Sequence, residues 1–276
     1  MSKPKTISLS AKELFDAGQL QAAIETLTLE VKTNPTDNWR RTFLFELLCF
    51  KGEWNRAEGQ LDVLALQSAK AEIGVQAYRN NIIAERARQR LMSESLQPNF
   101  LMPPPAYIDF HLSAIDRIRE KQPEQARKLL DRSEQERPKV AGRLNGKKIH
   151  NLRDYDDLFA PVLEVFVQEK YTWLPFEQIK RLEIEAPKEL RDLLWTRARI
   201  TTIDAIIGEV FVPVLYPGSS VHPNDLIKLG RMTDWQEVIE GLYVANGMHV
   251  YLADNKEKTI FDLKEIEFET KMLKAK

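Results

Sequence analysis

Apolar residues recur every three or four positions through the first half of the chain, as they do along one face of an α-helix. Within this half, "AGQLQAAIETL" at 17–27 and "KGEWNRAEGQL" at 51–61 can be aligned with a spacing of 34 residues. A period of 34 residues is typical of the helix–turn–helix repeat of tetratricopeptide proteins, in which small residues let two antiparallel helices pack closely. The residues that coincide include Gly18 with Gly52, Ala23 with Ala57 and Leu27 with Leu61.

A fainter copy of the pattern lies at "REKQPEQARKLL", residues 119–130, where Pro123 occupies a helix-start position that tolerates proline. Between the copies, "SAKAEIGVQAYRNNIIAERARQRLM" at 68–92 is helical in pattern but matches the repeat poorly, and four prolines interrupt 97–105. We therefore predict about three helical hairpins over residues 8–137, one of them irregular. An ordinary helical bundle with two similar hairpins is the alternative.

The second half changes to short runs rich in β-branched and aromatic residues, such as "VLEVFVQ", "YTWLPF" and "EVFVPVLY", separated by turn residues. Because proline cannot donate to a strand ladder, Pro213 favours an edge strand or a bulge. The prediction is an α+β chain with segregated halves. We expect a tetratricopeptide-like helical domain at 1–140 and a mainly β domain at 141–276, with a short helix near 187–196.

The composition and charge of the chain argue against nucleic-acid and membrane partners. Forty basic and forty-one acidic residues give a net charge of −1, which provides no general attraction to nucleic acid or to an anionic membrane. Cys49 is the only cysteine, so the chain has no internal disulfide. No stretch resembles a signal peptide or a membrane span. We expect a cytoplasmic protein without nucleic-acid or membrane partners.

Catalytic and cofactor signatures are weak. The four histidines are scattered, which predicts no metal site, and the chain has no GxSxG, Walker A or GxGxxG motif that would indicate a nucleophile or a cofactor. Asp154, Asp156 and Asp157 beside Arg153 form an acidic cluster that could hold a cation or a basic partner, or form a solvated turn or the entry to a strand. "LGRMTDWQ", residues 229–236, is either a recognition site or a turn in which Asp234 pairs with Arg231 and Trp235 packs in the core.

Six segments together resemble the ImpE family, also called TagJ or SciE-type proteins, which accompany bacterial type VI secretion gene clusters. They are "LLCFKGEWNRAEGQL", "NLRDYDDLFAPVLEVF", "YTWLPFEQI", "PKELRDLLWTRA", "GEVFVPVLYPGS" and "LGRMTDW". The resemblance implies a non-enzymatic accessory protein that binds the N-terminal helix of the small sheath subunit, of the VipA or TssB kind. It also implies an indirect link to sheath disassembly by the ClpV AAA+ ATPase. It carries over no catalytic motif and no assignment of partner-binding residues.

Stacked helical hairpins form a concave surface that suits a peptide or a helix. Residues that offer aromatic anchors or hydrogen-bond donors at suitable places are our candidates for partner binding. They are Trp39, Arg40, Phe43, Tyr78, Arg79, Asn80, Arg231, Asp234 and Trp235. Two other functions stay open: an enzyme of unfamiliar type that uses the acidic cluster of the β half, and a structural module that dimerises.

Overall fold

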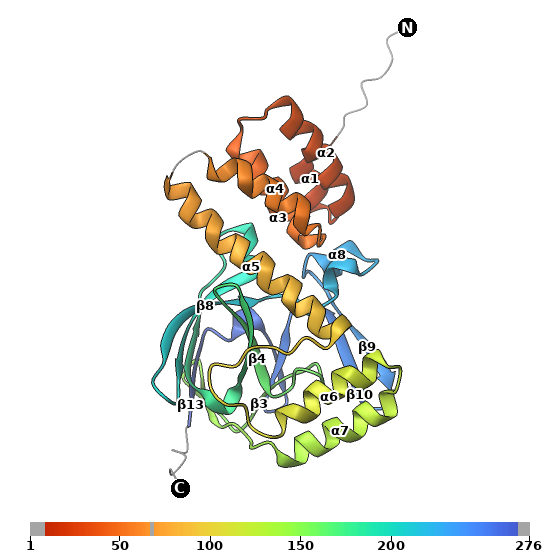
Figure 1. Ribbon diagram of the computed structural model, residues 1–276, viewed down its shortest axis with the longest axis vertical. Helices are drawn as coiled ribbons and strands as arrows, with labels where there is room; N and C mark the ends of the chain where they lie inside the picture. The colour runs from red at the N-terminus through yellow and green to blue at the C-terminus, as the bar shows by residue number, and fades with distance from the viewer. Residues whose placement is uncertain (1–8, 67–68, 270–276) are drawn as a thin grey trace.

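The computed structural model describes residues 9–66 and 69–269, and in this part of the chain helices come first and strands follow (Figure 1). This order confirms the predicted α+β fold. The helices before the first strand are α1 (Ala11–Asp16), α2 (Leu20–Thr33), α3 (Asn38–Phe50), α4 (Trp54–Ala65), α5 (Ala69–Glu94), α6 (Ile108–Arg119) and α7 (Pro123–Glu136).

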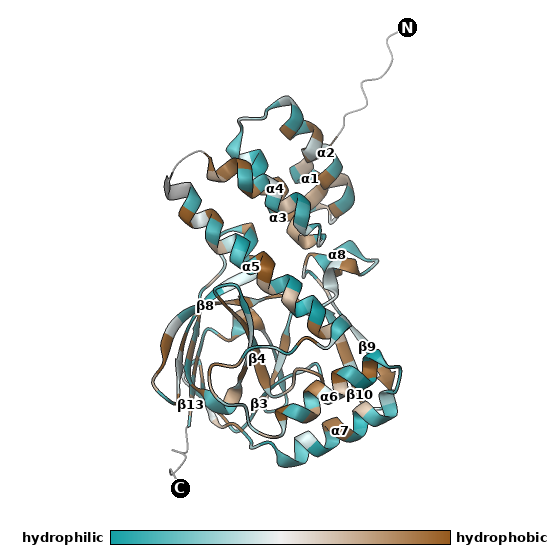
Figure 2. Ribbon diagram, in the orientation of Figure 1, coloured by the Kyte–Doolittle hydropathy of each residue, from teal (hydrophilic) through white to brown (hydrophobic). Residues whose placement is uncertain are grey.

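The first two hairpins, α1–α2 and α3–α4, follow from the repeat. Ser10 and Glu13 form the capping box that begins α1. Gly18 and Gly52 follow the first helix of each hairpin with φ of +76° and +72°, a conformation that glycine adopts without strain. Ala23 and Ala57 are fully buried, as close helix packing requires. Figure 2 shows hydrophobic and hydrophilic residues alternating around these helices, as the sequence pattern predicts.

Helix α5, in the segment that matches the repeat poorly, does not form a hairpin. It is a single helix of 26 residues that crosses from the first two hairpins to the β part, where it contacts β5 (Figure 1). Helices α6 and α7 form a third hairpin beside the β part, with Pro123 in the first turn of α7.

The strands form one large antiparallel sheet and two small ones. The eight-stranded sheet has the order β2-β1-β13-β6-β7-β8-β4-β5, the three-stranded sheet has the order β12-β11-β3, and β9 pairs with β10. Strand bounds are β1 (Gly142–Leu144), β2 (Lys147–Ile149), β3 (Leu152–Asp154), β4 (Val162–Val167), β5 (Lys170–Pro175), β6 (Ile179–Ile184), β7 (Trp195–Thr202), β8 (Ile207–Pro213), β9 (Thr233–Ile239), β10 (Leu242–Gly247), β11 (Val250–Ala253), β12 (Lys256–Thr259) and β13 (Glu265–Phe268).

Short helical turns connect several strands. The 3-10 helix η2 (Leu190–Leu193) lies where the sequence indicated a helix near 187–196. The other turns are η1 (Phe176–Gln178), η3 (Ser219–Val221), α8 (Asp225–Lys228) and η4 (Ile260–Asp262).

The expectation of an edge strand or a bulge at Pro213 is wrong, because β8 is not an edge strand and its register with β7 is regular. Strand β8 lies inside the large sheet between β7 and β4, and Pro213 is its last residue. Pairing of β8 with β4 is limited to Phe211 opposite Phe166, so the ladder on that side has ended before Pro213. The missing N–H therefore costs no strand hydrogen bond there.

A continuous hydrophobic core connects the helical and β parts. Trp195, at the start of β7, is buried, and its ring lies 6.3 Å from that of Trp54 on α4 and 6.4 Å from that of Tyr78 on α5. The hairpins are thereby fixed against the sheet. None of the described helices combines the length and the apolar character needed to cross a membrane.

Candidate functional site

A row of aromatic rings with a cation at one end brings candidates from the two halves of the chain together. The guanidinium of Arg231 lies 4.7 Å from the ring centre of Phe15 on α1. Phe15 packs edge-on against Phe43 at 5.7 Å, and Phe43 lies 5.4 Å from Trp39. We call Arg231, Phe15, Phe43 and Trp39 the Trp39 row. Its two ends are accessible, because Arg231 is exposed and Trp39 is 59% exposed.

The inner members of the Trp39 row are supports rather than contact surface. Phe43, a candidate anchor from the sequence, is buried between its two ring neighbours. Arg231 is anchored at its Nη1, which donates to the carbonyl oxygen of Asp16 at 2.9 Å. Among the described residues Arg231 has no ion-pair partner, so its charge is available to a ligand. Arg40, next to Trp39, pairs with Glu30 and Asp37.

The remaining candidates of "LGRMTDWQ" point elsewhere. Asp234 lies 3.4 Å from Nε2 of His222 and does not pair with Arg231. Trp235 is half-buried, with its ring 4.5 Å from that of Tyr155. The turn therefore divides its candidate residues between two surfaces.

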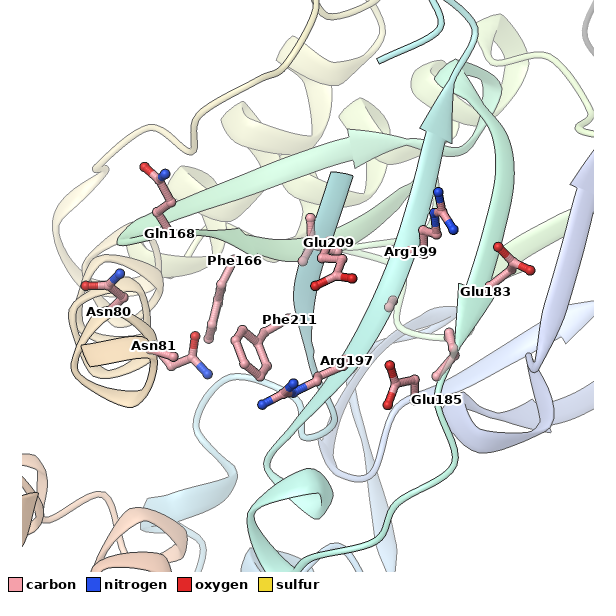
Figure 3. A pocket seen from close by; sticks show the side chains of 14 residues that line it. Asn80, Asn81, Phe166, Gln168, Glu183, Glu185, Arg197, Arg199, Glu209 and Phe211 are labelled. Carbon is pink, nitrogen blue, oxygen red and sulfur yellow. The ribbon is translucent and has the colours of Figure 1, made fainter. Parts of the chain in front are cut away.

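The three candidates on α5 are also separate from the Trp39 row. The hydroxyl of Tyr78 accepts a hydrogen bond from Arg191 Nε at 2.7 Å, and Arg79 pairs with Asp62 at 2.6 Å. Asn80 lies at a cavity of about 590 Å³ between α5 and one face of the large sheet (Figure 3). Tyr78 and Arg79 thus hold α5 against its neighbours, whereas Asn80 lines the cavity with its Oδ1 accepting a hydrogen bond from Gln76 Nε2 at 2.9 Å.

Two of the three acids in the cluster, Asp154 and Asp156, are buried, which contradicts the interpretation as a solvated turn. Asp157 is half-buried and pairs with Arg153 at 2.7 Å. Oδ1 of Asp154 accepts hydrogen bonds from the hydroxyl of Tyr216 at 2.7 Å and from the backbone of Asp156. Asp156 accepts the backbone N–H groups of Leu158 and Ala245, each at 2.8 Å. The carboxylates thus position strands and loops. No group of three or more His, Cys, Asp and Glu side chains within 9–66 and 69–269 could hold a metal ion.

Asp154 belongs to a buried charge network that the sequence did not reveal. Nε and Nη2 of Arg88 on α5 donate to the two carboxylate oxygens of Glu164 on β4, at 2.8 and 2.6 Å. Nη2 of Arg88 also donates to the carbonyl oxygen of Leu215. His249 lies between the two acids, 2.8 Å from Asp154 and 3.2 Å from Glu164. The network fastens α5 to three segments of the β part.

The network determines the charge states of its members. Burial opposes ionisation of Glu164, but Arg88 and His249 outweigh it and hold its pKa well below the ordinary value. Burial likewise opposes protonation of His249, yet Asp154 and Glu164 raise its pKa. At neutral pH the network therefore contains a buried guanidinium and a buried carboxylate that neutralise each other.

The spacing of residues along α5 contains a pattern that indicates the buried position of Arg88. Asn81, Ala84, Arg88 and Leu91 follow one another at spacings of three, four and three residues, and all four are buried. Such spacing defines one face of a helix, so two polar residues interrupt an apolar stripe. In most proteins, polar side chains at such buried positions form hydrogen bonds with protein groups or with ordered water.

Comparisons with known proteins decide the family. The model of the family "ImpE protein" matches residues 146–267. The type VI secretion system accessory component TagJ of Pseudomonas aeruginosa is 35% identical over 264 residues, which cover 96% of this chain and 92% of the relative. The chain belongs to the ImpE/TagJ family.

A solved structure shares the fold. The crystal structure of protein VPA1032 from Vibrio parahaemolyticus matches with a TM-score of 0.87 at 24% sequence identity, covering 95% of this chain and 98% of that one. The ImpE match includes Asp154, Glu164 and His249 of the buried network, and Arg231 of the Trp39 row. Arg88 and the three aromatic residues of the Trp39 row lie before the matched residues. The similarity to TagJ extends over the helical part as well.

A buried acid outside this network, Glu46, makes the contact between α3 and η2 sensitive to pH. Glu46 on α3 is buried and lies 3.1 Å from Nη1 of Arg191. Burial raises the pKa of Glu46 to about 7, although Arg191 opposes the shift. Because the unfolded chain has a Glu pKa of about 4.3, the folded state holds this proton more tightly. Its contribution to stability is complete below about pH 4.3 and is lost as the pH rises through about 7.

Glu46→Gln is therefore expected to flatten the pH dependence of stability. Between pH 5 and 7.5 the free energy of unfolding of the native chain should fall relative to that of the variant, by up to roughly 3 kcal/mol. Urea denaturation of both proteins at the two pH values measures this difference. Parallel changes in the two proteins would contradict the assignment to Glu46.

Proposed function

We propose that this chain is a non-enzymatic accessory component of a type VI secretion system. In this proposal it binds, in the cytoplasm, the N-terminal helix of the small subunit of the contractile sheath. Support comes from family membership and from the relative TagJ, which is named an accessory component of that system. The bound sheath subunit would connect the chain indirectly to a ClpV-type ATPase.

The observation that carries the binding proposal is the Trp39 row. Trp39 is a large exposed aromatic residue on the first helix of the second hairpin, where helical repeats present side chains to a partner. The buried rings of Phe15 and Phe43 support it, so little side-chain freedom is lost on binding. An amphipathic helix would place apolar residues on Trp39 and an acidic residue near Arg231.

The direct test uses the whole sheath subunit from the same gene cluster. The subunit and a version without its N-terminal helix are passed separately over the immobilised full-length protein in biolayer interferometry. Saturable binding of the first and none of the second is the expected result. Equal binding of both would overturn the proposed ligand while leaving an accessory role intact.

Trp39→Ala is expected to weaken binding of the sheath subunit by at least about tenfold, because a central aromatic anchor contributes on the order of 2 kcal/mol. Ile207→Ala is a suitable control, since Ile207 is 60% exposed but lies at the start of β8. Dissociation constants of both variants follow from the same interferometry. If both variants lost the same affinity for the sheath subunit, or if neither lost any, Trp39 would not be part of the interface.

The division into domains at 1–140 and 141–276 is part of this proposal, with α5 joining the two. Removal of 141–276 would leave Arg88 without Glu164, because this buried pair crosses the division. Substitutions in the full-length chain are therefore the sounder way to assign binding to one half.

A further inference from the structure

Asn81 is the unexplained residue of the cavity between α5 and the sheet. It is 1% exposed, and neither Oδ1 nor Nδ2 has a hydrogen-bond partner among the described residues. A buried polar group without a partner costs about 1 to 3 kcal/mol. Figure 3 shows its side chain pointing from α5 toward Phe211 and Arg197. A ligand that fills this part of the cavity could satisfy both atoms.

The free atoms of Asn81 specify the kind of group that fits. A carboxamide offers one acceptor oxygen and an NH2 donor side by side. A peptide unit has the complementary N–H and C=O groups, so Asn81 suits the backbone of an extended chain. Asn80 and Gln168 add two further carboxamides to the lining, on the same side of the cavity (Figure 3).

The charges of the lining favour an anionic side chain near Asn81. Arg197 and Arg199 are exposed on β7, and neither has an ion-pair partner among the described residues. The guanidinium of Arg197 lies 5.6 Å from the ring centre of Phe211. Three carboxylates also line the cavity: Glu183 shares Arg181 with Glu265 and Glu267, and Glu185 lies 3.7 Å from Lys188. Arg199 lies opposite Glu183 in the ladder, so Arg197 is the cation that the proposed ligand would meet. Glu209 has no ion pair within the part of the chain that the structure describes, and it lies opposite Arg199 in the ladder.

The layout of the cavity favours a chain over a compact molecule. Its lining continues from β6 across β7 and β8 to Phe166 on β4 and then to α5. Neighbouring strands lie about 4.8 Å apart, so the crossing from β6 to β4 measures roughly 14 Å. An extended peptide of about four or five residues has this length.

We propose that this cavity binds an extended peptide segment with an acidic side chain. Asn81 pairs with one backbone peptide unit, Phe166 and Phe211 contact the adjacent apolar atoms, and Arg197 pairs with the carboxylate. The cavity is separate from the Trp39 row, and the peptide that it binds is a different ligand from the one proposed for that row. The inference does not depend on the sheath helix as a partner.

Display of random octapeptides on immobilised full-length protein tests the proposal. Selected peptides are expected to be enriched in Asp and Glu, and the best of them are then measured by fluorescence anisotropy. Arg197→Glu and Asn81→Leu should each weaken binding at least tenfold. Asn81→Leu keeps the side-chain volume and removes an unpaired polar group, so its melting temperature should equal or exceed that of the native chain.

Arg143→Glu is the matched control for charge, because Arg143 is an exposed arginine on β1, outside the cavity lining. It should leave the affinity of the selected peptides unchanged. Selection without acidic enrichment would overturn the proposal. Acidic peptides that bind both cavity variants as tightly as the native chain would also overturn it, since they would occupy another surface.

Discussion

Replacing Arg88 with methionine is expected to lower the free energy of unfolding by about 3 to 5 kcal/mol, because Glu164 would keep a buried charge without its partner. Both side chains are nearly inaccessible, at 3% and 2% exposure. Chemical denaturation monitored by tryptophan fluorescence measures the loss. Adding Glu164→Gln to the variant should recover part of it, since the amide has no charge to neutralise.

Arg90→Met is the matched control for Arg88. Arg90 lies on the same helix, is 55% exposed and pairs with Glu94 at 2.8 Å. Exposed pairs contribute less than about 1 kcal/mol, so this variant should be almost as stable as the native chain. If the two substitutions lowered the free energy of unfolding equally, the buried network around Arg88 would not be what holds α5 against the β part.

Replacing Gly247 with alanine is expected to cost about 3 kcal/mol or more. Gly247 ends β10 with φ of +105°, and an added Cβ would lie 2.1 Å from the carbonyl oxygen of Met232 and 2.9 Å from Cα of Thr233. Both neighbours are backbone atoms, which cannot rotate away as a side chain can. The variant must displace β9 from β10, and thermal unfolding followed by circular dichroism measures the cost.

Gly241→Ala separates the steric part of this effect from the conformational part. Gly241 also has a positive φ, +75°, but nothing lies within 4 Å of its added Cβ. Its substitution should cost only the backbone strain, about 1 to 2 kcal/mol. A Gly247 variant no less stable than the Gly241 variant would contradict the close approach of the two strands.

The helical hairpins could be predicted because their information is local. The capping box at Ser10, the glycines after each first helix and the small residues at 23 and 57 act within a few residues of their own position. The apolar strands β4 to β8 were also visible as β-rich runs. Strands β9 and β10 were not predicted, since no residue of β9 is fully buried and its identity depends on pairing with its neighbour.

The site was less predictable than the fold because its contacts join distant segments. Arg88 meets Glu164 and His249 across 76 and 161 residues, and no local pattern specifies such partners. Phe43 and Trp39 are four residues apart on one helix, yet one is buried and the other exposed, which depends on the packing of Phe15 from α1. The interrupted apolar stripe of α5 was the one available signal for both Arg88 and Asn81.

Calorimetric titration is the most direct test of the proposal that the chain is an adaptor for a sheath helix. The ligand is a synthetic peptide with the sequence of the N-terminal helix of the small sheath subunit from the same gene cluster. The expected result is saturable 1:1 binding with a dissociation constant that is micromolar or tighter, which corresponds to a binding free energy of about −8 kcal/mol. No binding heat at any temperature tested, with peptide at several hundred micromolar, would contradict the claim that this helix is the ligand.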